Sequence, residues 1–150
     1  MKVKVKKLNE NAVIPFKTYE KDFCYDVVAV SEEEVAPNVW KYGIGLAFQI
    51  DRGDTFFAIS DAKISIDFRP RSSVWKTGMV LSNCEGTIDE LYTGEVFAVF
   101  YHVFPNMERY KVGQRIGQIK IGTTMPIEFV IVDELDETER NSGSYGSTGV

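Results

Sequence analysis

Residues 94–104 read GEVFAVFYHVF, an apolar run that is rich in aromatic and β-branched side chains. A short run of this kind, opened by a glycine, favours a β-strand. Similar runs occur on both sides of it along the chain, and polar residues, glycine or proline separate many of them. These runs are KVKVK (2–6), YDVVAV (25–30), GIGLAFQI (43–50), TFFAIS (55–60), KISIDF (63–68), GMVLS (78–82), RIGQIKI (115–121) and IEFVIV (127–132).

The strand-like runs predict an all-β protein. Helical periodicity is not sustained, and at most one turn of helix is expected near RPRSSVWK (69–76). Many short strands in a chain of 150 residues favour a single β-sandwich or β-barrel domain. The composition changes near residue 133, where DELDETER (133–140) leads into a tail rich in glycine and serine. We therefore expect a core over residues 1–136 and a flexible functional tail over residues 137–150.

The composition also narrows the choice of partners and compartment. A net charge of −5 makes duplex nucleic acid or an anionic membrane a poor partner. No apolar run approaches the roughly 20 residues of a membrane span, and no apolar stretch follows the basic start as in a signal peptide. Cys24 and Cys84 lie far apart, so we expect reduced thiols in a cytoplasmic protein. The single histidine, His102, argues against a zinc site and against a Ser–His–Asp triad.

Two stretches carry charged side chains that interrupt the strand pattern. Asp26 lies inside the apolar run FCYDVVA (23–29), so its carboxylate is exposed, paired or used in chemistry. In RPRSS (69–73), two arginines flank a proline and two serines follow. Guanidinium groups match phosphate oxygens, so RPRSS is open to two interpretations, a phosphate site and a surface turn with ordinary salt bridges.

A third stretch, GTIDELYTGE (86–95), is expected to form a hairpin with a polar tip. A carboxylate on a rigid hairpin, such as Asp89, can hold a water molecule as a general base. The ring of Tyr92 can press against a sugar, and the strand backbone can bind the edge of a flat base. The alternative interpretation is a solvated hairpin tip without a ligand.

Two more stretches are weaker signals when taken alone. In GQRIGQI (113–119), Arg115 and Gln118 fall on opposite faces of an extended strand, so only a bulge or a turn would bring them together. The tail RNSGSYGSTGV (140–150) is too poor in apolar side chains to fold by itself. It is either a frayed end or a lid that orders over a phosphate-bearing ligand.

In this order, the five stretches FCYDVVA, RPRSS, GTIDELYTGE, GQRIGQI and RNSGSYGSTG resemble the five motifs of the trimeric dUTPases (dUTP pyrophosphatases). The third and fifth are the specific ones, and the others count through their order and spacing. The resemblance implies a jelly-roll-like β-sandwich or barrel that assembles as a homotrimer with shared active sites. It also implies Mg²⁺-assisted hydrolysis of dUTP to dUMP and pyrophosphate, and it makes the tail a lid.

The resemblance assigns roles to individual residues. Asp89 activates or orients the water that attacks the α-phosphate, and Tyr92 packs against the deoxyribose and excludes a 2′-hydroxyl. Asp26 supports the water shell of a Mg²⁺ ion that the substrate phosphates mainly hold. The residues expected to bind dUTP are Asn83 and the backbone of Gly86 and Ile88 at the uracil, Arg71, Ser72 and Gln118 at the phosphates, Arg140, Ser147 and Thr148 at the γ-phosphate, and Tyr145, followed by Gly146, at the base.

Several positions depart from the family pattern, and two rival functions stay open. Cys24, Gln114 and Gly117 stand where the motifs usually have glycine, aspartate and alanine. A dCTP deaminase shares the fold but needs a catalytic glutamate in the strand after the third motif, about where this chain has Val99. The second rival is a nucleotide-binding regulatory protein on the same scaffold.

Overall fold

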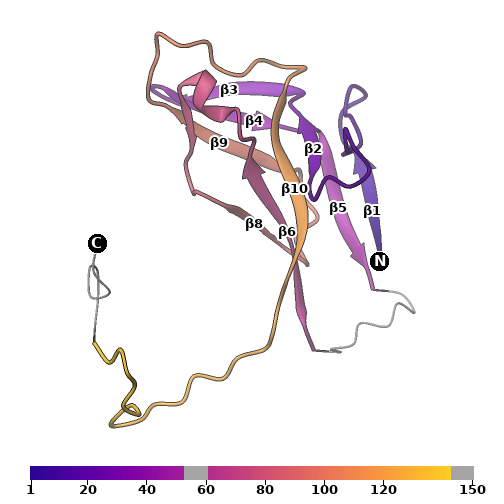
Figure 1. Cartoon of the computed structure of the whole chain (residues 1–150). Helices are drawn as coiled ribbons and strands as arrows, with labels where there is room; N and C mark the ends of the chain where they lie inside the picture. Colours follow the sequence, from indigo (N-terminus) through magenta and orange to yellow (C-terminus); the bar gives the residue numbers. More distant parts are fainter. Residues whose placement is uncertain (53–60, 143–150) are drawn as a thin grey trace.

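A computed structural model describes residues 1–52 and 61–142 of the chain. The described part contains ten strands and one short 3₁₀ helix, η1 (Val74–Thr77), so the all-β prediction and the single helical turn are confirmed (Figure 1). The predicted strand over residues 55–60 lies outside the described residues. No helix in the described part is long and apolar enough to cross a membrane.

The strands form three antiparallel sheets that enclose one core. A small sheet pairs β1 (Lys2–Lys7) with β5 (Leu46–Asp51). One larger sheet has the order β2 (Tyr25–Val28), β10 (Arg115–Thr124), β6 (Lys63–Pro70) and β8 (Gly86–Asp89). The other has the order β3 (Ser31–Ala36), β4 (Val39–Gly43), β9 (Phe97–His102) and β7 (Met79–Leu81).

Aromatic side chains from both larger sheets meet in the core. Tyr42 on β4 and Phe100 on β9 are fully buried, with ring centroids 6.0 Å apart in an edge-on arrangement. Phe68 on β6 packs against the same Phe100 ring at 6.4 Å. The buried hydroxyl of Tyr42 donates a hydrogen bond of 2.8 Å to the carbonyl of Tyr110. These contacts hold the two sheets at a fixed spacing, and the candidate site is built on their edges.

Tyr42→Phe should destabilise the fold by about 1 kcal/mol, because it removes the buried hydrogen bond to the Tyr110 carbonyl and a longer one of 3.3 Å from Arg109 Nη1, without opening a cavity. The Tyr110 carbonyl keeps a second donor, Nη1 of Arg109 at 2.9 Å, so the loss stays small. Urea unfolding at a fixed protein concentration measures it. Tyr101→Phe is the control, since Tyr101 is half exposed on β9 and should lose nothing. Equal midpoints for the two variants would contradict the role given to the Tyr42 hydroxyl.

The pairing of β8 differs from the predicted hairpin. β8 pairs with β6, with Ser65 opposite Asp89, whereas β9 pairs with β4 and β7 in the other sheet. The hairpin prediction for residues 86–95 is therefore wrong: this stretch crosses from one sheet to the other. We call residues 83–96 the corner segment. A period-two pattern identifies strands but does not say which strands pair, and that explains the error.

The run 127–132 does not form the strand that the sequence predicts. All residues from 123 to 142 are exposed, and the chain from residue 125 onwards leaves the sheets as the orange and yellow trace of Figure 1. We call residues 125–142 the C-terminal arm. Phe129 and Ile131 are 89% and 99% exposed. A β-strand needs a neighbour for its backbone hydrogen bonds, and residues 1–52 and 61–142 offer none to the arm.

Candidate active site

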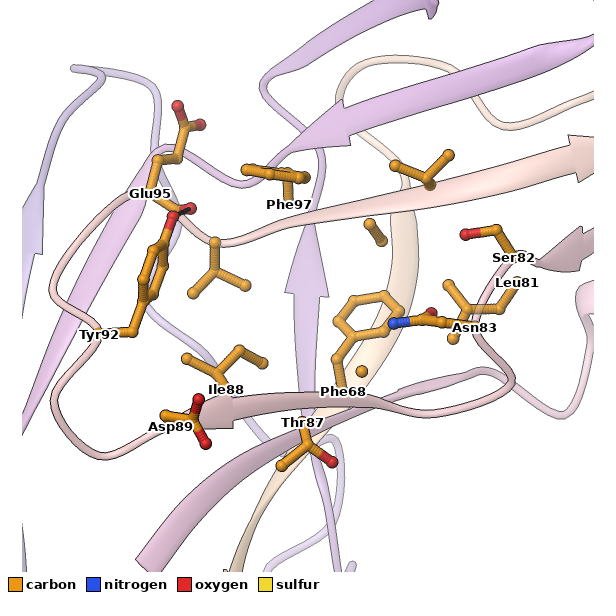
Figure 2. A pocket seen from close by; sticks show the side chains of 14 residues that line it. Phe68, Leu81, Ser82, Asn83, Thr87, Ile88, Asp89, Tyr92, Glu95 and Phe97 are labelled. Atoms are coloured by element: carbon orange, nitrogen blue, oxygen red, sulfur yellow. Dashed lines mark hydrogen bonds between the residues drawn. The ribbon is translucent and has the colours of Figure 1, made fainter.

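The corner segment and β9 enclose a cavity of about 310 Å³, which is within the range of small-molecule sites, roughly 300–1,000 Å³. We call it the base-side cavity, after the uracil contacts that the sequence resemblance assigns to Asn83, Gly86 and Ile88, and Figure 2 shows it from close by. Its walls combine apolar side chains of the core edge with polar side chains of the corner segment. The lining residues are Phe68, Leu81, Ser82, Asn83, Gly86, Thr87, Ile88, Asp89, Tyr92, Glu95, Val96, Phe97, Ala98 and Val99.

Strand alternation places Asp89 at this cavity. On β8, Ile88 is partly buried against the core, so the next residue, Asp89, points away from it and is exposed. The Asp89 carbonyl accepts a hydrogen bond of 3.0 Å from the backbone N–H of Tyr92, which closes the turn after β8. Within residues 1–52 and 61–142, the Asp89 carboxylate has no hydrogen-bond or ion-pair partner. It is therefore available to a water molecule or a ligand.

The ring of Tyr92 stands beside Asp89 in a fixed orientation (Figure 2). Its hydroxyl donates a hydrogen bond of 2.9 Å to the carbonyl of Glu95. A Cβ at Gly94 would lie 2.6 Å from this hydroxyl, so the close approach of the ring requires glycine at position 94. The face of the Tyr92 ring, held through its hydroxyl, thus forms one wall of the cavity next to the Asp89 carboxylate.

A second cavity, of about 450 Å³, lies where β2, β10 and the end of β6 meet. We call it the phosphate-side cavity, because Arg71, Arg115 and Gln118 line it together with Asp26. Asp26 is only 4% exposed, and a lone carboxylate at that depth would be costly. Three donors offset the cost: Nη1 of Arg115 at 2.8 Å, Nε2 of Gln118 at 3.0 Å and Nε of Arg71 at 3.5 Å.

A β-bulge brings Arg115 and Gln118 to the same carboxylate. The register between β10 and β2 shifts between Arg115 and Gly117, which turns both side chains towards Asp26. The sequence predicted that only such an irregularity could make them partners. Each arginine commits few of its five N–H donors to Asp26, so the remaining donors can face an anionic ligand.

The glycine at position 117 also has a structural reason. A Cβ on Gly117 would lie 2.1 Å from the Phe68 ring, which covers this position from β6. The alanine that is usual in the fourth motif would therefore require the Phe68 side chain to move. With glycine at position 117, the side chains of Gln118 and Arg115 keep their contacts with Asp26.

The matches to known proteins decide the family. The dUTPase family model covers residues 10–149. The chain belongs to the dUTPase family. Its relatives include proteins named deoxyuridine 5′-triphosphate nucleotidohydrolase from Nautilia profundicola, 34% identical over 151 residues and 99% of both chains, and from Clostridium novyi, 36% identical over 152 residues and 100% of both. The family prediction is confirmed.

Solved structures support the fold of this dUTPase family member. The dUTPase of Staphylococcus bacteriophage 80alpha, solved with dUPNHPP, superposes with a TM-score of 0.77 and covers 99% of both chains at 23% identity. A mutant of the same phage enzyme superposes with a TM-score of 0.73. The predicted jelly-roll-like architecture of the dUTPase type is confirmed.

Eight of the fourteen predicted site residues gather in two groups within the protomer. Asn83, Gly86, Ile88, Asp89 and Tyr92 line the base-side cavity. Asp26, Arg71 and Gln118 line the phosphate-side cavity, and the two cavities share no lining residue. Ser72 is exposed beside Arg71 but lines neither cavity, and Arg140 lies in the C-terminal arm away from both. Tyr145, Gly146, Ser147 and Thr148 lie outside the described residues.

Some residues of the two cavities were not predicted as site residues. Arg115 lies within the fourth motif, and the sequence required a bulge or a turn to bring it together with Gln118, but its partnership with Asp26 was not predicted. Glu95, whose Oε1 accepts a hydrogen bond of 2.9 Å from the backbone N–H of Gly45, is the last residue of the third motif. Phe97 and Val99 also line the base-side cavity. They belong to the apolar run 94–104, whose pattern predicts a strand and gives no signal for a binding site.

Proposed function

We propose that this chain hydrolyses dUTP to dUMP and pyrophosphate, with Asp89 as the general base. The observation that carries the proposal is the Asp89 carboxylate, which has no partner among residues 1–52 and 61–142, beside the Tyr92 ring at the base-side cavity. Asp89 takes a proton from a water molecule as the water oxygen attacks the α-phosphate, and the bond to the β-phosphate breaks. Removing dUTP keeps uracil out of DNA and supplies dUMP for thymidylate synthesis.

The base-side cavity accounts for selectivity in this proposal. The corner segment brings backbone amides and carbonyls of Gly86–Ile88, and the side chain of Asn83, to the edge of the uracil. A close backbone wall rejects the 5-methyl group of thymine, and an unmatched donor rejects cytosine. The Tyr92 ring packs on the deoxyribose and leaves no space for a 2′-hydroxyl.

The phosphate-side cavity supplies the positive charge that the triphosphate needs. The Arg71 and Arg115 guanidinium groups and the amide of Gln118 donate to phosphate oxygens, and Asp26 fixes the orientation of all three donors. Ser72 adds a hydroxyl from the turn before η1. Arg140, Ser147 and Thr148 grip the γ-phosphate, and Tyr145 stacks on the base, when the tail closes.

The donor set fits Mg²⁺ that is bound mainly through water and substrate. The described residues contain no group of three or more His, Cys, Asp or Glu side chains placed to hold a metal ion. Mg²⁺ keeps several waters and is commonly held by one carboxylate plus phosphates. Asp26, buried among the phosphate donors, is the carboxylate that would bind such a water shell. When bound, Mg²⁺ would neutralise charge on the triphosphate.

We also propose a homotrimer whose active sites are shared between subunits. One dUTP molecule spans a base, a sugar and three phosphates, yet the two cavities of a protomer have no lining residue in common. A base-side cavity of one subunit facing a phosphate-side cavity of another would make one complete site. The exposed apolar side chains of the C-terminal arm support the same assembly, because such a surface is normally covered.

The arm should pack on a neighbouring subunit. An apolar groove of about 360 Å³ beside β1 and β10, lined in part by Val5, Ile14 and Ile121, fits an extended apolar segment. The acidic stretch DELDETE (133–139) and the lysines of β1 have opposite charges, so they favour this contact over others.

Replacing Phe129 and Ile131 together with serine should weaken the trimer, because each burial contributes about 1.5–3 kcal/mol. Sedimentation velocity at micromolar concentration should show a trimer for the wild type and monomers for the variant, with the β-sheet signal in circular dichroism unchanged. Glu128→Gln, a polar change in the same arm, is the control. A wild-type monomer, or a variant that stays trimeric, would refute the role given to the arm.

The deaminase alternative is not favoured. Val99 lines the same cavity as Asp89, so the position expected for a deaminase glutamate faces the ligand space and carries no carboxylate. The regulatory alternative has no observation of its own on this chain. The two thiols, Cys24 and Cys84, are free, which fits the cytoplasm as the place of action.

A nucleotide panel tests the proposed function. The protein is incubated with Mg²⁺ and dUTP, UTP, TTP or dCTP, and pyrophosphate, orthophosphate and ammonia are measured in each reaction. We expect pyrophosphate from dUTP, little from the others, and loss of turnover when EDTA removes the metal. Orthophosphate from dUTP, or ammonia from dCTP, would replace the proposed reaction with another one.

A further inference from the structure

Glu90, the residue directly after Asp89, is held by a bidentate ion pair. Nε and Nη2 of Arg52 lie 2.5 and 2.6 Å from the two carboxylate oxygens of Glu90. Nη2 of Arg52 also donates to the carbonyl of Ala62 at 3.0 Å. One guanidinium group therefore ties together the end of β5, the start of β6 and the end of β8. We call these contacts the Arg52–Glu90 clamp.

The protonation equilibria agree with a tight pair. The hydrogen bond from Arg52 holds the pKa of Glu90 below its usual value, and a backbone hydrogen bond at Ile64 acts in the same direction. The hydrogen bond to Glu90 in turn raises the pKa of Arg52. Both groups therefore stay charged at neutral pH. Among exposed pairs, bidentate arginine–carboxylate geometry is the kind that fixes a position.

Asp89 and Glu90 differ in a way that suggests a division of labour. The Glu90 carboxylate is saturated by Arg52, whereas the Asp89 carboxylate has no partner in the described parts of the chain. Because no described residue forms a hydrogen bond or an ion pair with the Asp89 carboxylate, the position of this side chain depends on the backbone of residues 89 and 90. That backbone ends a four-residue edge strand, which by itself frays easily.

We propose that the Arg52–Glu90 clamp is a positioning device for the general base Asp89; the inference rests on the proposed function. The clamp anchors the backbone one residue beyond Asp89, while the bond from Gly45 to Glu95 anchors the other side of the turn. The turn between these anchors carries both Asp89 and Tyr92. Misplacing a catalytic group by about 1 Å can cost about 10²-fold in rate, so a loose turn would be costly.

The test uses Arg52→Ala and Glu90→Gln in the full chain, alone and combined. We expect kcat for dUTP to fall at least about ten-fold, and KM to change less than about two-fold, because the clamp touches no substrate. The double variant should lose no more than either single variant, since both remove the same pair. Asp51→Asn is the matched control: it breaks the neighbouring Lys4–Asp51 ion pair of 3.6 Å and should leave kcat unchanged.

A second arm separates positioning of Asp89 from general damage to the fold. In an Asp89→Asn background, adding Glu90→Gln should cause no further loss, because there is no base left to position. An equal loss in both backgrounds would overturn the inference, and so would wild-type kcat in Arg52→Ala or a loss carried by KM. If the wild type itself released no pyrophosphate from dUTP, the proposed function would fail. An active wild type with an equally active Arg52→Ala variant would refute the positioning role of the clamp and would leave the proposed function standing.

Discussion

Asp89→Asn should lower kcat for dUTP by about 10²–10⁴-fold, the usual contribution of a general base. The amide keeps the size of the side chain but cannot take the proton of the attacking water. The Asp89 carboxylate has no partner among residues 1–52 and 61–142, so its loss breaks no contact of the described fold. Binding of a non-hydrolysable dUTP analogue should stay within about three-fold of the wild type.

Steady-state kinetics and calorimetric titration with the analogue measure the two quantities. Glu108→Gln, the same chemical change at an exposed position outside both cavities, is the control and should behave as the wild type. An Asp89→Asn variant within a factor of about two of wild-type kcat would remove Asp89 from the mechanism. A variant that fails to bind the analogue would show that Asp89 serves binding instead.

Ending the chain after Asp136 should abolish turnover and leave the thermal midpoint nearly unchanged. The described residues 137–142 are all exposed, so removing them uncovers no core surface. The same cut removes Arg140, Tyr145, Ser147 and Thr148, to which we assign the γ-phosphate and base contacts. Without them the phosphates lose charge-assisted donors, and the site stays open to water.

Calorimetric melting, sedimentation and dUTP turnover test this separation of fold and function. Arg140→Ala in the full-length chain is the narrower variant and should reproduce part of the loss by weakening substrate binding. A truncated protein that retains full activity would make the tail dispensable. A large fall in melting temperature would mean instead that the tail belongs to the folded core.

The sequence predicted most of the strands that alternate or run apolar. β3 (SEEEVA) was not predicted, because three consecutive glutamates on an exposed edge strand give no apolar pattern, and β4 (VWKYG) was not predicted although it holds three apolar or aromatic side chains. The apolar run IEFVIV was predicted as a strand but has no neighbouring strand in the described part of the chain. Local patterns do not report whether the hydrogen-bond partner belongs to the same chain.

The site was predictable through its motifs, but its geometry was not. Asp26, Arg71 and Gln118 come from three separate stretches, and their convergence needs the pairing of β10 with both β2 and β6. The sequence showed that Arg115 and Gln118 could meet only through an irregularity such as a bulge, but it did not show where along β10 the bulge lies. Arg52 and Glu90 are separated by 38 positions, and no motif includes Arg52. Such contacts follow from tertiary pairing, which period-two patterns leave open.

Hydrolysis of dUTP in ¹⁸O-labelled water, followed by mass spectrometry of both products, tests the central claim most directly. If the Asp89 carboxylate directs water to the α-phosphate, the heavy oxygen should appear once in dUMP and not in pyrophosphate. Label in pyrophosphate would place the attack on the β-phosphate. Orthophosphate, or an unlabelled dUMP, would contradict the reaction that we propose.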